Sequence, residues 1–143
     1  MGNLHTLDVA FIGNIDNEAL LPLLSRDPGS LLCLNCGGPR CVITDLILER
    51  LPASLTGLDL AECAMIRDFS PLMRLRCLSS LSLDSCRISL QQLLQICETC
   101  PLTSLNVASS CVDDFSLAAL AEMRPRLLDI ELRNCAISDF GLE

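Results

Sequence analysis

The sequence predicts an α/β solenoid of about six repeats, in which short parallel strands alternate with helical segments. Two observations carry this prediction. An apolar pattern recurs with its middle residue at Leu7, Leu32, Leu58, Leu81, Leu105 and Ile130, in steps of 23 to 26 residues. Half of the 143 residues are hydrophobic, yet the aromatic side chains are only four Phe. The core must therefore be mainly aliphatic, which suits a stack of similar layers.

The repeated pattern is L-x-x-L-x-L-x-x-C. It is LTGLDLAEC at 55–63, LSSLSLDSC at 78–86 and LLDIELRNC at 127–135, and it returns with one extra residue as LTSLNVASSC at 102–111. The chain resembles the cysteine-containing subclass of leucine-rich repeats, in which Cys takes the place of Asn. The resemblance implies a right-handed solenoid with parallel strands on the concave face and helices on the convex face. We expect residues 1–143 to form a single domain that is a fragment of a longer array.

The first two repeats have recognisable helix and turn signals. Asp16 is the predicted N-cap of a helix over 17–24, and Asp27-Pro28-Gly29 is a strong turn signal. The second repeat is the least regular, because Gly29 stands where a Leu belongs and GGPR at 37–40 lengthens the turn. Its strand is expected at 32–34, and its helix runs from Thr44 or Asp45 to about Arg50.

The later repeats each carry an amphipathic segment, over 66–76, 88–100 and 112–124. Pro71 is tolerated only in a first helical turn, so the third helix is expected to start around Ser70. Ser89 and Asp113 are the predicted N-caps of the fourth and fifth helices. The sixth helix should begin at Ser138-Asp139.

The charge and composition exclude several classes of function. The net charge is −8, which argues against nucleic-acid binding, and the absence of Lys removes lysine-based catalysis. No apolar run is long enough to span a membrane. Met1-Gly2 begins an M-G-x-x-x-[ST] pattern, so membrane attachment is expected only if Gly2 is myristoylated. Without a signal peptide, the ten Cys indicate an intracellular, cytoplasmic and reduced protein.

The cysteines and the single histidine do not indicate a metal, a cofactor or an enzyme. Cys63, Cys86 and Cys135 fall in register, with Cys111 one place off, and are interpreted as reduced packing groups. The spacings Cys33-x2-Cys36 and Cys97-x2-Cys100 occur in zinc sites, but the two pairs belong to different layers of the solenoid. Catalysis would have to use His5, on the exposed first strand.

The residues that point outward from the strands are the candidate binding site. Between the last two apolar residues of each motif they are Asp8, Cys33, Asp59, Ser82, Asn106 and Glu131. The flanking positions, with Asn35 on one side and Leu31 on the other, are mostly small and add Asp84 and Asp129. We predict a non-catalytic module that binds a protein partner, favouring a basic one, through Asp59, Ser82, Asp84, Asn106, Asp129 and Glu131. An outward strand position that is simply solvated would also be polar, and this interpretation stays open.

Two alternative functions follow from other features. The cysteine-type motif is similar to the repeats that recognise substrates beside an F-box in ubiquitin-ligase receptors, although no F-box segment occurs in this sequence. Neither the first nor the sixth repeat carries a polar capping segment, so an architectural block that self-associates through its open ends is the second alternative.

Overall fold

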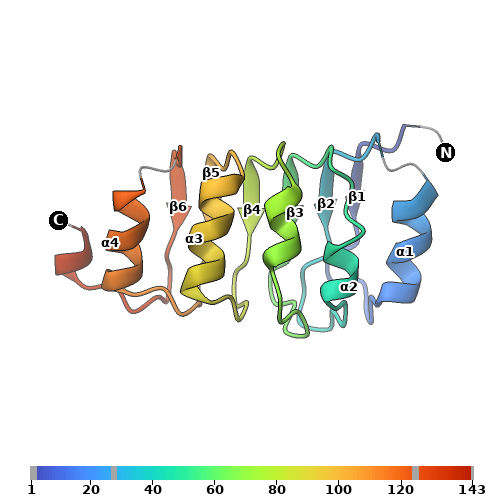
Figure 1. Ribbon diagram of the computed structural model, residues 1–143. Helices are drawn as coiled ribbons and strands as arrows, with labels where there is room; N and C mark the ends of the chain where they lie inside the picture. Colours follow the sequence, from blue (N-terminus) through green and yellow to red (C-terminus); the bar gives the residue numbers. More distant parts are fainter. Residues whose placement is uncertain (1–2, 27–28, 124–125, 143) are drawn as a thin grey trace.

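The structure, a computed structural model, describes residues 3–26, 29–123 and 126–142. Within these residues six strands form one sheet in the order β1-β2-β3-β4-β5-β6, and every neighbouring pair is parallel. The helical segments lie in a row over one face of the sheet, and the chain advances layer by layer from one end to the other (Figure 1). This arrangement confirms the predicted α/β solenoid of six leucine-rich repeats.

Each repeat contributes one strand and one helical segment. The strands, three residues each, are β1 (Thr6–Asp8), β2 (Cys33–Asn35), β3 (Gly57–Asp59), β4 (Ser80–Ser82), β5 (Ser104–Asn106) and β6 (Asp129–Glu131). The helical segments are α1 (Asn17–Arg26), α2 (Asp45–Leu48), η1 (Ser70–Arg74), α3 (Leu90–Thr99), α4 (Asp114–Glu122) and η2 (Asp139–Leu142). The two η segments are 3₁₀ helices.

The predicted N-caps are confirmed. The Asp16 carboxylate accepts the Ala19 N–H at 2.9 Å, and the Ser89 hydroxyl accepts the Gln92 N–H at 3.2 Å. The Asp113 carboxylate accepts the Ser116 N–H at 2.8 Å. Each bond satisfies a donor that the first helical turn leaves without a partner. The turn predicted at Asp27-Pro28-Gly29 falls partly outside the described residues.

The third repeat forms only a short 3₁₀ helix where a longer amphipathic helix was expected. Its start at Ser70 is confirmed, with Pro71 in the first turn. The step from Leu58 to Leu81 is also the shortest between strands, although only one residue shorter than the step from Leu81 to Leu105, which holds α3. A 3₁₀ helix rises about 2.0 Å per residue instead of 1.5 Å, so it crosses the layer with fewer residues.

The register expected for the second repeat is wrong by two residues. Leu34, and not Leu32, pairs with Leu7 on one side and Leu58 on the other. The buried Leu31 opens the motif, so Gly29 does not occupy a Leu position. The turn after β2 is correspondingly longer, because Leu34 and Cys41 are seven residues apart where Leu58 and Cys63 are five. Cys41 therefore takes the cysteine position of this repeat.

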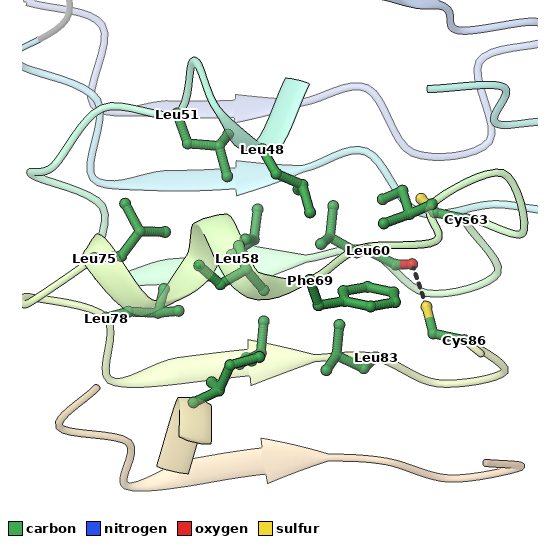
Figure 2. Close-up of a cluster of buried hydrophobic side chains, with 14 of the residues drawn as sticks. Leu48, Leu51, Leu58, Leu60, Cys63, Phe69, Leu75, Leu78, Leu83 and Cys86 are labelled. Carbon is green, nitrogen blue, oxygen red and sulfur yellow. Dashed lines mark hydrogen bonds between the residues drawn. The ribbon is translucent and has the colours of Figure 1, made fainter. Parts of the chain in front are cut away.

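The core lies between the sheet and the helical row and is almost entirely aliphatic. Leu58, Leu60, Leu75 and Leu78 are among the side chains that surround Phe69 in the middle of the stack (Figure 2). Phe69 is 0% exposed, whereas the other three Phe lie on the surface, with Phe115 74% exposed. One aromatic ring thus compensates for the short 3₁₀ segment of the third repeat.

We predict that Phe69→Ala lowers the free energy of unfolding by about 3–5 kcal/mol, because a buried ring is replaced by a cavity that close-packed layers cannot refill. Phe115→Ala is the matched control and should change it by less than about 0.5 kcal/mol. Urea unfolding followed by far-UV circular dichroism measures both. A Phe69 variant as stable as the control would contradict the packing described here.

Candidate functional site

The candidate site is the strand face, which we define as the face of the sheet turned away from the helical row. The central residue of β2 to β5 is buried against the helices, so the residues on either side of it point to the strand face. The sheet register aligns the third residue of each strand into one line, which we call the acceptor row: Asp8, Asn35, Asp59, Ser82, Asn106 and Glu131. Asn35 thus takes the place that was predicted for Cys33, which lies two residues earlier, at the start of β2.

Five of the six side chains in the acceptor row hold the backbone of their own turn. Each accepts a hydrogen bond from the N–H two residues further on, at 3.0 Å for Asp8, 3.2 Å for Asn35, 2.9 Å for Asp59, 2.9 Å for Asn106 and 3.2 Å for Glu131. These are the side-chain turns that Asp and Asn favour. The polar character of this row therefore has a structural cause, which was not recognised from the sequence.

The carboxylates of the strand face have few cationic neighbours. The one ion pair found in the described parts of the chain joins Glu131 to Arg133 at 3.7 Å, between exposed side chains. Asp59 and Asp84 are half-buried, and Asp84 accepts the Ser85 hydroxyl at 2.8 Å. Within the described residues Glu131 therefore has a cationic partner, whereas Asp59, Asp84 and Asp129 have none.

A shallow hollow of about 540 Å³ lies over β1 to β4. Asp8, Cys33, Asn35, Asp59 and Ser82 line it. Gly57 is small enough to leave room for the Cys33 side chain, since a Cβ there would meet the Cys33 sulfur at 3.3 Å. The exposed Cys33 is thus part of the hollow.

The six predicted residues divide into two groups on this surface. Asp59 and Ser82 belong to the hollow, whereas Asp84, Asn106, Asp129 and Glu131 lie outside it. Asp129 and Glu131 stand on β6, which is exposed along its whole length. The strand face is therefore one continuous surface with its depression toward the N-terminal strands.

The repeat cysteines connect successive layers through their thiols. Cys86 donates its S–H to the carbonyl of Leu60 at 3.1 Å, as drawn in Figure 2, and Cys135 donates to Val107 at 3.2 Å. Burial raises the pKa of the Cys86 thiol to about 12, so this donor keeps its proton. Cys63 and Cys86 are buried and Cys135 is half-buried, as expected of packing groups. Cys111 is exposed and Ser110 occupies the cysteine position of the fifth repeat.

The remaining candidate groups lie apart from one another. Cys36 contacts the turn after β3, while Cys100, at the end of α3, donates to the carbonyl of Leu72. Residues 3–26, 29–123 and 126–142 contain no group of three or more His, Cys, Asp or Glu arranged to hold a metal ion. His5 is exposed beside β1, and Gly2 lies outside the described residues. None of the described helices is long and apolar enough to cross a membrane.

The fold is similar to that of two internalins, which are leucine-rich-repeat proteins, from Listeria monocytogenes str. 4b F2365. The match to inlF has a TM-score of 0.65, 24% sequence identity and coverage of 96% of this chain and 37% of inlF. The match to internalin C2 (inlC2) has a TM-score of 0.57 and 22% identity, covering 94% of this chain and 73% of inlC2. No protein-family model matches the chain, and no curated protein matches its sequence. The likeness shows the leucine-rich-repeat fold, while the cysteine subclass and the F-box similarity rest on the motif alone.

We predict that Asp59→Ala lowers the free energy of unfolding by about 1–2 kcal/mol, because the Ala61 N–H loses its acceptor in a half-buried turn. For Asp59→Asn the free energy of unfolding should stay within about 0.5 kcal/mol of that of the unaltered chain. An Asn can make the same bond, because the amide oxygen of Asn106 accepts the equivalent N–H in the fifth repeat. Urea unfolding compares the two variants. Equal losses in both would show that the charge, and not the acceptor, is what the turn requires.

Proposed function

We propose that this chain is a non-catalytic module that binds a basic segment of a partner protein along the strand face. The observation that carries the proposal is the hollow over β1 to β4, whose carboxylates Asp8 and Asp59 have no cation beside them in the described residues. Unpaired carboxylates around a depression favour positive side chains of a partner and disfavour acidic ones. We further propose an intracellular, cytoplasmic location, in keeping with ten cysteines that are all free.

The hydrogen-bond pattern of the acceptor row supports this proposal. The Asp59 carboxylate uses its Oδ1 atom for the Ala61 N–H, which leaves Oδ2 free to accept from an Arg or Lys of the partner. The Asn35 and Asn106 side chains likewise use their oxygens, and their amide nitrogens remain as donors that a partner can use. Acceptors and donors therefore alternate along the row, as an extended peptide with both basic side chains and backbone carbonyls would need.

The proposed interaction surface extends from the hollow to the other predicted residues. Asp84 and Asn106 continue the face beyond β4, and Asp129 adds an exposed carboxylate at β6. The Glu131 carboxylate is shared with Arg133 and contributes less net charge. The centre of recognition is therefore placed at Asp8, Asp59 and Asp84, with β6 at the rim.

A narrower form of this proposal is a substrate-recognition arm of an F-box-type ubiquitin ligase. It rests on the cysteine-type motif, in which Cys63, Cys86 and Cys135 recur at one position and bridge successive repeats. It requires an F-box segment in the parent chain. A complete gene without that segment would remove this form and leave the general binding proposal intact.

The binding proposal predicts that neutralising the strand face removes partners. The test variant is Asp59→Asn, Asp84→Asn, Glu131→Gln, which keeps the oxygen acceptors and therefore the turns. The matched control, Glu49→Gln, Glu98→Gln, Glu122→Gln, makes the same change of net charge on exposed positions of the helical side. Affinity capture from a lysate of the source cells is compared for the unaltered chain and both variants.

The expected result is that basic proteins bound by the unaltered chain and by the control are lost, or bound at least tenfold more weakly, by the strand-face variant. Their binding to the unaltered chain should also weaken as salt rises, because exposed charge pairs are screened. Partners retained equally by all three proteins would contradict the strand face as the binding surface.

A second proposal is that the open ends of the solenoid associate with each other. On the last repeat Leu128 is 83% exposed and Phe140 86% exposed, an unusual apolar surface for a single layer. No described residue accepts from the N–H groups of Leu132 and Asn134, whose counterparts Val9 and Phe11 donate to the next repeat. The first repeat of a second copy offers the matching carbonyls at Asp8 and Ala10, so the two ends complement one another head to tail.

This second proposal predicts a concentration-dependent oligomer in sedimentation velocity experiments. Leu128→Thr combined with Phe140→Ser should shift the chain to monomer, because it removes the apolar part of the contact. Met65→Ser, at a half-exposed position in the middle of the stack, is the control and should leave association unchanged. A chain that stays monomeric over a hundredfold range of concentration would contradict association through the ends.

A further inference from the structure

Three cysteines gather where the long turn of the second repeat meets the third repeat. The Cys63 thiol points at the Cys41 sulfur with 3.4 Å between the two Sγ atoms, and it lies 3.8 Å from the carbonyl oxygen of Cys36. Cys63 is 0% exposed and Cys41 is 7% exposed. This is a direct contact between two thiols. It joins residues that are far apart in sequence and belong to neighbouring repeats.

A cavity of about 470 Å³ leads from the surface to this cluster. Its walls include Phe11, Ile12 and Arg40, and both Cys36 and Cys41 line it, whereas Cys63 lies behind them. A small molecule that enters the cavity therefore reaches Cys41 before Cys63. This order of access is sufficient for oxidation, because a peroxide has to react with only one thiol of a pair, and the second thiol then reacts with the first.

We propose that Cys41 and Cys63 form a redox-active pair, which a peroxide oxidises to a disulfide that links the second and third repeats. In the first step the Cys41 thiol gives up its proton and the thiolate attacks one peroxide oxygen; the O–O bond breaks, and the hydroxide that leaves takes up that proton, so a sulfenic acid and water form. In the second step the Cys63 thiolate attacks the Cys41 sulfur, the S–S bond forms, and the S–O bond breaks with release of water. Two thiols and one hydrogen peroxide thus give one disulfide and two water molecules.

The reaction requires a shift of the turn that carries Cys41. A disulfide bond is about 2.05 Å long, so the two sulfurs must approach by roughly 1.4 Å. The turn is two residues longer than in the third repeat, and Gly38 adopts φ +148°, a region that other residues rarely enter. Cys86, in contrast, is held in a turn of ordinary length and donates to the Leu60 carbonyl. The 3.4 Å contact therefore favours Cys41 over Cys86 as the partner of Cys63.

The surroundings of Cys41 and Cys63 also determine how fast the pair is oxidised. The S–H contact with Cys63, together with burial, raises the pKa of the Cys41 thiol well above its ordinary value. Since the thiolate is the reacting form, oxidation is slow at neutral pH and becomes faster as the pH rises. Cys33, Cys77 and Cys111 are exposed to a peroxide in solution and must be replaced in any test.

The experiment uses the full chain with Cys33→Ser, Cys77→Ser and Cys111→Ser. The folded protein is treated with hydrogen peroxide at several pH values, the free thiols are blocked with N-ethylmaleimide, and the chain is digested with trypsin. Cleavage after Arg40, Arg50 and Arg67 places Cys41 alone on peptide 41–50, Cys63 alone on 51–67, and Cys36 on 27–40. Mass spectrometry then reads the pairing directly, and the same digestion of the unsubstituted chain guards against an effect of the three replacements.

The expected result is a reducible cross-link between peptides 41–50 and 51–67, formed faster at pH 9 than at pH 7. Its formation should raise the melting temperature by roughly 10 °C, because the closed loop restricts the unfolded chain. Cys41→Ser should abolish both effects. A cross-link between 27–40 and 51–67, or chains whose Cys41 and Cys63 remain fully reduced while sulfenic acid accumulates elsewhere, would overturn the proposal. This inference is independent of the binding function proposed above.

Discussion

The hydrogen bonds between successive repeats are the constraint on which the rest of this structure depends. At each boundary the strands pair in parallel, and a corner N–H such as that of Glu62 or Ser85 donates to a carbonyl of the following repeat. The corner residues reach these positions with positive φ, between 57° and 61° for Phe11, Glu62, Ser85 and Asn134. Because a single layer cannot bury its own leucines, every layer must present the same donors and acceptors to the next.

This constraint explains why the acceptor row of the strand face consists mostly of side chains that accept hydrogen bonds. A turn directly follows every three-residue strand, and its second N–H needs a local acceptor. Asp59 and Asn106 supply that acceptor with the same geometry, so the turn does not distinguish a charged from a neutral side chain. What the fold leaves unspecified is the charge, so the proposed binding function rests on the carboxylates at Asp8, Asp59 and Asp84.

The sequence predicted the repeat number and the helix starts at Asp16, Ser70, Ser89 and Asp113, because those depend on local signals of period and capping. It did not predict the register of the second repeat. Leu31, Leu32 and Leu34 all stand within four residues, so either Leu32 or Leu34 could be the middle residue of the motif. Pairing with the neighbouring strands selects Leu34. The hollow over β1 to β4 and the Cys41–Cys63 contact depend on that register, so neither could be found from spacing alone.

The irregular second repeat is also where the two proposed activities meet. Asp59 lies in the hollow, and its carbonyl oxygen accepts the backbone N–H of Cys36 at 3.1 Å. Gly37 packs so closely on the same turn that an added Cβ would come within 3.2 Å of the Asp59 carboxylate. The turn that would move if Cys41 joined Cys63 is therefore in direct contact with a carboxylate of the strand face. The elongated turn of the second repeat is therefore where the proposed thiol pair lies against the proposed binding surface.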